Sequence, residues 1–444
     1  MRKLLLVIAS LFSLSLYAQE DFDKAAKKGR EVIELFKNEK YADVYAMCDS
    51  VMKRKAGLDG IQQVWDGLIF SYDELEDIGE THCDTLRNLY ITTTKLKFKK
   101  LSTGLRVNFN KQYEIAGIWI DHTSGKHQTA SYVNTLNFIE TKIDFGLKDY
   151  PLQGTLTVPN RDGKYPCIVI VPGSGPVDRD LSIGPNKIYK DLAWGIAAKG
   201  ICVFRYDKRT KIYWDKLMEA HRQGDLYNIT KEYLEDIKEI MKKLSNNSHV
   251  DAKRIYIMGH SEGGSLLPLI MKNNKQVAGG IMLAGAARKM QDLMLYQFDY
   301  LTAGEKITQG QSDKIEMMKR QAKLALQGNL PKTTPDDSLP ANYPFSYWNE
   351  FNKYNITETA RKINKPMLIL EGERDYQVPM TDYRIWQKTM EGKQNVSFYS
   401  FSTLNHLFLE GKGKSMPKEY TVKSNVPEYV IDKIVEWVGS KGKR

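Results

Sequence analysis

The spacing of apolar positions divides the chain into two parts of different character. Between residues 21 and 80, apolar side chains recur near the helical period, which predicts three amphipathic helices. From Cys83 to Asp121, apolar and polar residues alternate between Gly and Asn interruptions, which predicts an antiparallel sheet. Helices followed by a meander describe a small α+β domain, which we place at residues 19–128. The polar stretch 122–129 is the expected linker.

After this linker, short apolar runs alternate with helical segments. The predicted strands are 142–146, 152–158, 167–171, 201–206, 254–258, 278–283, 367–370 and 396–399. The predicted helices are 188–198, 229–244, 265–271, 381–390 and 428–438. Such alternation favours an α/β domain at 129–444, with a mostly parallel sheet covered by helices on both faces. Because a long unstructured loop is improbable in a compact domain, we expect a helical lid at about 286–362.

The first 18 residues have the pattern of a secretory signal. Arg2 and Lys3 precede an apolar run from Leu4 to Leu16, and Ala18 provides a small residue at the expected cleavage point. The run is too short to span a bilayer, and no other stretch approaches the roughly 20 apolar residues that a transmembrane helix needs. The sequence therefore predicts a periplasmic or extracellular protein without stable membrane insertion.

Composition narrows the possible partners. The formal net charge of +11 includes Arg2 and Lys3, and the other basic residues are spread along the chain without a polybasic block, so nucleic-acid binding is not expected. No metal site is predicted, because no His-Glu-x-x-His motif occurs. Cys167 and Cys202 lie in apolar runs typical of buried strands, so we expect no disulfide between them. The sequence leaves open whether Cys48 and Cys83 pair.

The strongest chemical motif is at residues 259–263, which read Gly-His-Ser-Glu-Gly. An apolar strand precedes this motif, and another glycine and a helix-forming run follow it. This is the pattern of a nucleophile elbow, in which the serine occupies a tight strand-to-helix turn and the glycines avoid Cβ clashes. Ser261 is therefore the candidate nucleophile.

A serine hydroxyl needs a base to accept its proton. The chain has seven histidines, and the one that follows Ser261 is His406, just after the last predicted strand. His406 is the candidate base. We interpret His260 as structural, because neighbouring positions of the elbow point away from the serine.

The acid that orients the base is expected between the serine and the histidine in the chain. Asp375 lies on the polar turn after the strand 367–370, at the carboxyl edge of the sheet, and is preferred over Glu371 and Glu373. Asp207 precedes the nucleophile, which is the wrong order for an acid. We expect it to brace its own loop with Arg205 or Arg209.

Two backbone N–H groups are expected to bind the oxyanion. One belongs to Glu262, the residue after the nucleophile. The other is assigned to Ser174 in the Gly-rich loop 172–176, directly after the strand that ends at Val171. This loop lacks the Lys-Ser/Thr ending of a phosphate-binding P-loop, although a plain turn remains an alternative.

From about residue 140 to its end, the chain resembles bacterial α/β-hydrolases of the carboxylesterase type. The segments that carry the resemblance are 173–180, 204–209, 259–263, 372–378 and 404–408. Pro172 departs from the His common at this position, and Thr210 from the usual Gly. The resemblance implies hydrolysis of a small-molecule ester without a cofactor. The N-terminal domain resembles small cystatin-like or nuclear-transport-factor-like modules.

The favoured function is a serine carboxylesterase that hydrolyses short-chain acyl esters through an acyl-enzyme intermediate. Tyr296, Phe298, Tyr300 and the segment 344–348 are expected to line the acyl pocket or to form the core of the lid. A serine peptidase or aminoacyl amide hydrolase is the second hypothesis, and a non-catalytic binding protein on the same scaffold is the third. Oligomeric state and natural substrate do not follow from the sequence.

Overall fold

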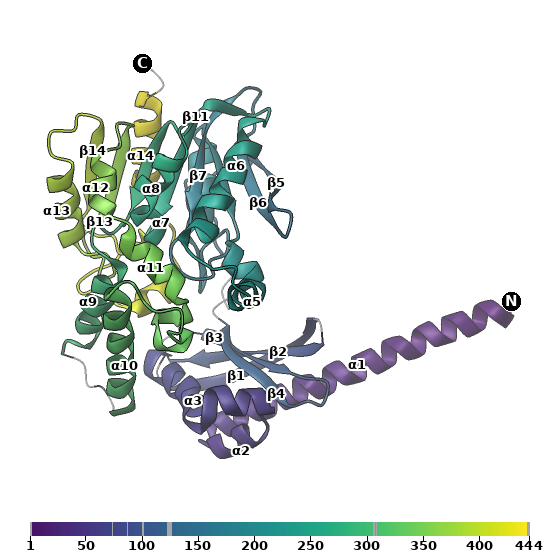
Figure 1. Ribbon diagram of the computed structural model, residues 1–444. Helices are drawn as coiled ribbons and strands as arrows, with labels where there is room; N and C mark the ends of the chain where they lie inside the picture. The colour runs from purple at the N-terminus through teal and green to yellow at the C-terminus, as the bar shows by residue number, and fades with distance from the viewer. Residues whose placement is uncertain are drawn as a thin grey trace. The chain divides into compact units, whose positions relative to one another are not determined.

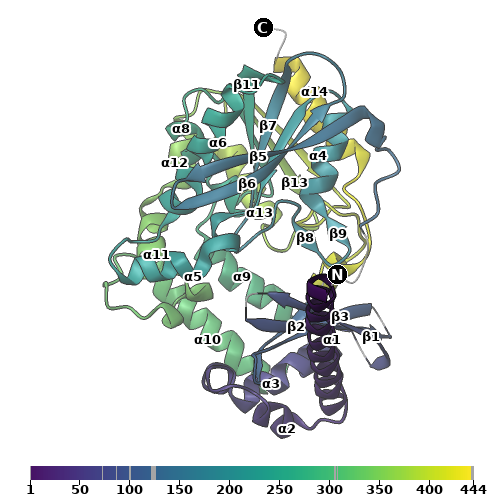
Figure 2. The same ribbon diagram turned by 90° about the vertical axis from the view of Figure 1, so that its right-hand side faces the viewer.

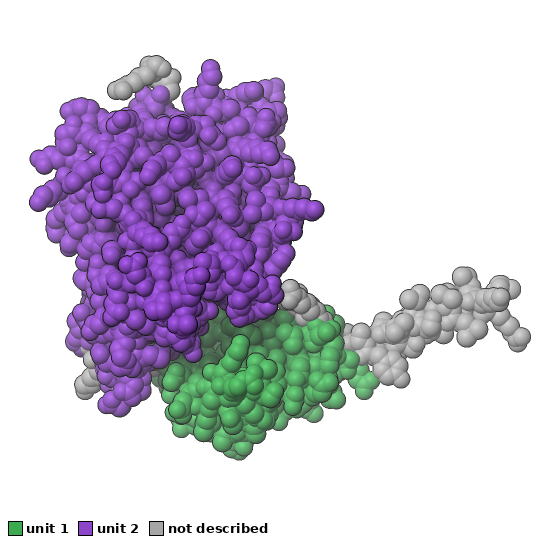
Figure 3. All heavy atoms as spheres, viewed as in Figure 1, with its two compact units in different colours: residues 1–127, 183–186, 420–423 green, residues 128–182, 187–419, 424–444 purple. Residues whose placement is uncertain are grey.

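The computed structural model describes residues 2–72, 74–86, 88–99, 102–121, 127–304, 307 and 309–441. Side chains are described from residue 20 onward, apart from those of residues 70, 71, 86 and 121, so the predicted signal peptide at 1–18 lies outside them. In the described residues, no helix is both long and apolar enough to cross a membrane. The chain forms two compact units, coloured separately in Figure 3, one of which contains residues 1–127 with 183–186 and 420–423.

The N-terminal unit combines helices with an antiparallel meander, as its sequence pattern predicts. Its helices are α1 (Arg2–Lys37), α2 (Tyr41–Ala46) and α3 (Ser50–Tyr72). The strands, which pair in chain order, are β1 (Leu75–Leu86), β2 (Leu89–Phe98), β3 (Ser102–Phe109) and β4 (Ile115–Asp121). Phe36, Trp65 and Phe98 belong to the core that this unit buries, and the Phe36 and Trp65 rings stack 5.4 Å apart.

The second unit is built on an eight-stranded sheet with the order β14-β13-β12-β11-β7-β10-β6-β5 in the described part of the chain. The strands are β5 (Phe138–Leu147), β6 (Tyr150–Pro159), β7 (Tyr165–Val171), β10 (Cys202–Tyr206), β11 (Val250–His260), β12 (Gly279–Leu283), β13 (Met367–Gly372) and β14 (Val396–Phe401). In sheet order, each pair of neighbouring strands from β14 to β10 is parallel. The strands β6 and β5 form an antiparallel hairpin, in which β6 pairs antiparallel with β10. All eight predicted strands are present in this mostly parallel sheet.

Strand order reverses at β7, which lies between β10 and β11. In open α/β sheets, ligands bind beyond the carboxyl ends of the strands at such a switch point. Figure 2 shows α4 (Ile188–Ala198) and α14 (Glu428–Lys441) on one face of the sheet, with α6 (Glu235–Ser245) and α8 (Leu267–Asn273) on the other. The loops after β7 and β11 therefore lie where the fold places a site.

The helical prediction needs three corrections. The helix expected over 229–244 begins with a π-helical turn, η2 (Thr230–Leu234), before α6. The helix expected over 265–271 is divided into α7 (Glu262–Ser265) and α8. The helix α5 (Arg209–Arg222) was not predicted, because its polar residues mask the helical period.

The long insertion after β12 is helical, as predicted, and Figure 1 labels its helices α9 to α12. They are α9 (Met290–Thr302), α10 (Gln309–Leu326), α11 (Phe345–Lys353) and α12 (Ile356–Arg361). The helix α13 (Met380–Thr389) follows β13 and fixes the start of the insertion, because its Asp382 accepts hydrogen bonds from the backbone N–H groups of Ala287 and Arg288, both at 3.0 Å.

The central strand β11 provides a test of this core. Ile257 is fully buried between the strands β7 and β12, whereas Ile139 on the edge strand β5 is 46% exposed. We expect Ile257→Ala to lower the free energy of unfolding by about 2–5 kcal/mol, because the lost methylenes leave a cavity. Ile139→Ala is expected to cost less than about 1 kcal/mol. Urea unfolding followed by fluorescence measures both values, and equal midpoints would contradict the assigned core.

Candidate active site

Ser261 occupies a strained turn between β11 and α7. Its backbone has φ 55° and ψ −119°, so a residue with a Cβ is held in the positive-φ region. Such a conformation costs about 1–3 kcal/mol and persists where the surrounding structure enforces it. The Ser261 N–H donates to the carbonyl of Leu283 at the end of β12, at 2.9 Å. The turn is the strand-to-helix elbow that the sequence predicted.

The two glycines of the motif allow the backbone to cross at this turn. A Cβ at Gly259 would lie 2.1 Å from the carbonyl oxygen of Gly263. A Cβ at Gly263 would lie 2.5 Å from the carbonyl oxygens of both Val171 and Pro172. Any side chain at either position would collide with backbone that cannot move aside. The two glycines of the motif are therefore required for the tight turn of the elbow and for its close packing against the end of β7.

His406 and Asp375 form a buried pair. His406 Nδ1 lies 2.6 Å from Asp375 Oδ2, with 4% and 0% of the two side chains exposed. The other carboxylate oxygen, Oδ1, accepts the N–H groups of Gln377 at 2.7 Å and Val378 at 3.0 Å. Because a carboxylate only accepts hydrogen bonds, Nδ1 carries the proton and Nε2 is the nitrogen able to accept another.

The other two acidic residues of this loop have different surroundings. Glu373 is bonded to the Ser400 hydroxyl at 2.7 Å in an exposed position. Glu371 is buried beside Asp375, and burial, together with the neighbouring carboxylate, raises the pKa of Glu371 well above its usual value. A protonated Glu371 donates to Asp375 and adds no second negative charge. Of the three acids, Asp375 is the one paired with His406.

His260, interpreted as structural, links the base to the loop after β7. Its Nε2 lies 2.9 Å from the carbonyl oxygen of His406, and its Nδ1 lies 3.0 Å from the Tyr189 hydroxyl. A carbonyl only accepts, so Nε2 carries the proton and Nδ1 accepts from Tyr189. Burial, and secondarily the nearby His406, lowers the pKa of His260 to about 3, which keeps its ring neutral. The His260 and His406 rings are 4.9 Å apart, which places His406 beside the residue preceding Ser261.

The loop 172–176 runs alongside the nucleophile. A Cβ at Gly173 would lie 3.1 Å from Ser261 Cβ and 3.6 Å from Ser261 Oγ. The Gly173 N–H donates to the Tyr189 hydroxyl at 3.3 Å, and the Gly175 N–H bonds to the Tyr343 hydroxyl. Between them, the Ser174 N–H donates to no acceptor within the residues that the structure describes. Ser174, predicted as an oxyanion donor, thus has an available N–H on this loop.

Glu262, the other predicted donor, begins α7. Its N–H is in the first turn, where helix geometry provides no intrahelical acceptor. Its buried carboxyl accepts from the hydroxyls of Tyr233, at 2.9 Å, and Tyr347. Burial is the main reason that the pKa of Glu262 is raised, to about 7. The backbone of Glu262 is available to a ligand, whereas its side chain is fully occupied.

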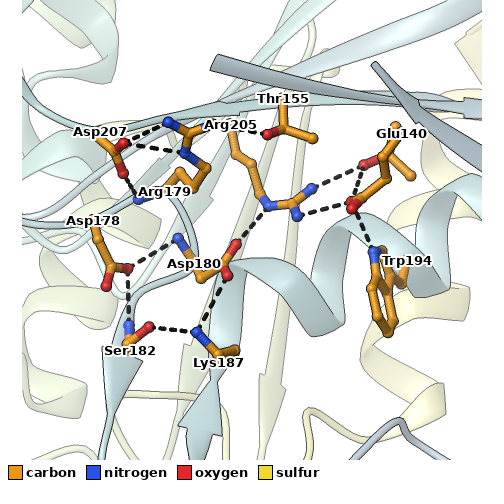
Figure 4. A network of polar contacts seen from close by, with 11 residues as sticks. Glu140, Thr155, Asp178, Arg179, Asp180, Ser182, Lys187, Trp194, Arg205 and Asp207 are labelled. Carbon is orange, nitrogen blue, oxygen red and sulfur yellow. Dashed lines mark hydrogen bonds and ion pairs between the residues drawn. The ribbon is translucent and has the colours of Figure 1, made fainter. Parts of the chain in front are cut away.

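Asp207 braces a loop, but with a different partner from those predicted. Its Oδ2 accepts from Nη2 and Nε of Arg179, at 2.6 and 3.1 Å, and its Oδ1 accepts from the Arg179 backbone N–H at 2.7 Å, as Figure 4 shows. Arg205 instead bonds to Asp180 and Glu140, and Arg209 pairs with Asp236 and Glu235. The expected pairing of Asp207 with Arg205 or Arg209 is wrong, because the loop 177–181 brings Arg179 across to it.

The aromatic residues of the insertion divide into two groups. Tyr296 and Tyr300 line a cavity of about 320 Å³ that also reaches Asp375, whereas Phe298 is not part of its lining. Tyr347 and Trp348 are buried in the main core. The segment 344–348 is therefore mainly lid core, with the Tyr347 hydroxyl directed to Glu262.

Sequence reasoning missed several residues that hold this site. Tyr189 lies in the first turn of α4, and Lys208 follows β10 and contacts the carbonyl of Gly173 at 2.9 Å. Lys208 lies inside the segment 204–209, which carries part of the family resemblance. This position was the one sequence signal that could have identified Lys208. No local pattern marks Tyr189, because its role depends on contacts made across the fold.

Comparison with known proteins assigns two parts of the chain to families. Residues 186–411 match the family described as serine aminopeptidase, S33, and residues 29–118 match a family described as a protein of unknown function, DUF3887. Esterase EstD of Thermotoga maritima is 31% identical over 402 residues, which cover 90% of this chain and 92% of that protein.

Solved structures with the same fold are more distant in sequence. Est1E from Butyrivibrio proteoclasticus is 16% identical, with a TM-score of 0.44, and the match covers 68% of this chain and 99% of that one. The Pyrococcus furiosus esterase PF2001 is 14% identical, with a TM-score of 0.44 and coverage of 71% and 97%. The relationship itself rests on the family match and on esterase EstD. The chain belongs to the serine aminopeptidase S33 family of α/β-hydrolases and is a serine hydrolase of the esterase type that carries an N-terminal DUF3887 domain.

Proposed function

We propose that this chain hydrolyses short-chain acyl esters through an acyl-enzyme intermediate on Ser261. The observation that carries the proposal is the buried pair of His406 and Asp375, joined at 2.6 Å and packed against the elbow that holds Ser261. This combination supplies a nucleophile, a base with a defined tautomer, and an acid that holds the tautomer.

In the proposed mechanism, Ser261 Oγ attacks the ester carbonyl carbon while His406 Nε2 takes the hydroxyl proton. The resulting oxyanion is bound by the N–H groups of Ser174 and Glu262, and Asp375 stabilises the imidazolium. Collapse breaks the bond to the alkoxy oxygen, which leaves with the proton from Nε2. Water, activated by the same nitrogen, then releases the carboxylic acid and restores the serine.

The preference for short acyl groups in this proposal comes from the family resemblance and not from a cavity. The cavity of about 320 Å³ beside Asp375 is lined by Tyr296, Tyr300 and Arg384, among others, but its lining contains neither Ser261 nor His406. Its volume therefore does not measure the acyl pocket. The similarity to esterase EstD supports an ester rather than a peptide substrate, although the matched family is named for aminopeptidase activity.

The sequence pattern of the N-terminus supports a proposal for where the enzyme is located. We propose that residues 1–18 direct export and are removed, which places the mature enzyme in the periplasm or outside the cell. A protein recovered from the cell exterior with its N-terminus at Gln19 would support this assignment.

The first prediction tests the nucleophile and the substrate class. We expect Ser261→Ala to lower turnover of p-nitrophenyl butyrate by at least about 10⁴-fold, because loss of a triad nucleophile removes most of the rate enhancement. Ser402→Ala, at an exposed turn position, is the matched control and should retain activity. Turnover is measured by release of p-nitrophenol from acetate, butyrate, octanoate and palmitate esters, with a preference for the short chains.

Two outcomes would replace the ester hypothesis. Faster cleavage of an aminoacyl p-nitroanilide than of the matching aminoacyl p-nitrophenyl ester, still dependent on Ser261, would favour a peptidase. Equal background rates in the unmodified protein and in Ser261→Ala would favour a binding protein.

The second prediction separates the three acids of the loop after β13. Asp375→Asn keeps the size of the side chain, but its amide cannot stabilise the imidazolium or hold the correct tautomer. We expect the kcat for ester hydrolysis to fall by about 10⁴-fold. Glu373→Gln, two residues away and exposed, should change kcat by less than about twofold, since it interacts with Ser400. A large loss in Glu373→Gln with little change in Asp375→Asn would reassign the acid.

A further inference from the structure

A buried cluster behind the loop 172–176 contains a lysine that the triad mechanism does not use. Lys208 Nζ lies 2.9 Å from the carbonyl oxygen of Gly173, 2.8 Å from the Tyr233 hydroxyl and 2.5 Å from Glu232 Oε1. These contacts use all three hydrogens of the ammonium group. The side chains of Lys208 and Glu232 are both 0% exposed.

The Gly173 carbonyl belongs to the same peptide unit as the Ser174 N–H. A trans peptide is planar, with its C=O and N–H directed to opposite sides. Holding the oxygen of Gly173 toward Lys208 therefore fixes the direction in which the Ser174 N–H points. The Tyr233 hydroxyl has one proton, which is shared between Glu262 at 2.9 Å and this oxygen at 3.1 Å, so it adds a weaker, three-centre contact on that side.

The flanking peptides of the loop are fixed independently. The N–H of Gly173 bonds to Tyr189, and that of Gly175 bonds to Tyr343, so the loop is held before and after Ser174. With these contacts made, rotation of the 173–174 peptide is opposed mainly by Lys208 and Tyr233. A cation on the carbonyl oxygen also polarises the amide, which makes its N–H a stronger donor.

The local backbone is shaped to complete this cluster. Glu232 and Tyr233 are consecutive residues, and both reach Lys208 from the π-helical turn η2. Single π-helical turns within helices occur frequently at functional sites. A fully buried ion pair rarely adds stability over well-packed apolar side chains, so stability alone does not account for the pair of Lys208 and Glu232.

We propose that Lys208 is a positioning residue for ester hydrolysis, whose ammonium group holds the Gly173 carbonyl and so aims and polarises the Ser174 N–H at the developing oxyanion. The inference rests on the proposed function, because it assigns Lys208 a role in the oxyanion step of that reaction. Lys208 lies two residues after the end of β10, where it reaches the loop after the neighbouring strand β7.

The test compares two buried ion pairs of the full chain. Lys208→Met alone would leave Glu232 buried and unpaired, so the informative variant is the double change Lys208→Met and Glu232→Gln. The matched control is Arg209→Met with Asp236→Asn, which removes the adjacent buried pair between α5 and α6. That pair makes no recorded contact with the loop 172–176 among the described residues. Labelling with a fluorophosphonate to completion counts the folded sites in each protein.

The expected result is a loss of transition-state stabilisation, with substrate binding nearly unchanged. Loss of a whole oxyanion donor costs about 10²–10³-fold in kcat, so a misdirected one should cost about 10–10²-fold in the Lys208/Glu232 variant, with KM changed less than about twofold. The inhibition constant of a short-chain trifluoromethyl ketone, whose adduct carries the oxyanion, should rise by the same factor as kcat falls. The methyl ketone counterpart, which forms little adduct, should bind as before.

Three outcomes would overturn the proposal: an unchanged kcat, a loss expressed in KM, or equal losses in both double variants, which would indicate a structural effect. If the Lys208/Glu232 variant does not fold, Tyr233→Phe removes one contact to the Gly173 carbonyl without changing charge. The Tyr233→Phe variant should lower kcat by about 3–10-fold at constant KM, as expected when an oxyanion donor is weakened rather than lost. An unchanged kcat in this variant would reject the proposal. Failure of the proposed function is distinguishable, because the unmodified chain would then lack Ser261-dependent ester turnover.

Discussion

The close approach of the nucleophile turn to the end of β7 is the constraint on which the rest of the site depends. Gly263 lies so near the carbonyls of Val171 and Pro172 that a single added methyl group would approach their oxygens to 2.5 Å. This contact brings the elbow after β11 and the loop after β7 together at the switch point of the sheet. The positive φ of Ser261 is maintained there by packing on both sides.

The loop that faces Ser261 owes its shape to partners from other elements. Its glycines have wide conformational freedom, so the chain of the loop alone does not specify one conformation. Tyr189 comes from α4, Lys208 follows β10, and Tyr343 belongs to the long insertion. The insertion therefore takes part in holding the loop 172–176.

The buried carboxyl groups near the site differ in their hydrogen-bond partners and in the direction of their pKa shifts. Asp375 accepts hydrogen bonds from two backbone N–H groups and from the imidazole of His406. Glu371, buried beside it, accepts the single backbone N–H of Gly372, and burial together with the Asp375 carboxylate raises its pKa. Glu232 lies against the ammonium group of Lys208, while burial raises the pKa of Glu262 to about 7. Each of these four carboxyl groups thus has its own hydrogen-bond or ion-pair partners among the described residues.

The sequence alone determined the eight strands, the helical insertion, and the order of Ser261, Asp375 and His406, because periodicity and the Gly-x-Ser-x-Gly spacing are local properties of the chain. Tertiary structure decided the partner of Asp207, since Arg179 reaches it only when the loop after β7 folds across β10. It also decided the π-helical turn at Glu232 and the place of Lys208 against Gly173, 35 residues away. Such contacts join distant segments, and no local pattern of apolar and polar residues encodes them.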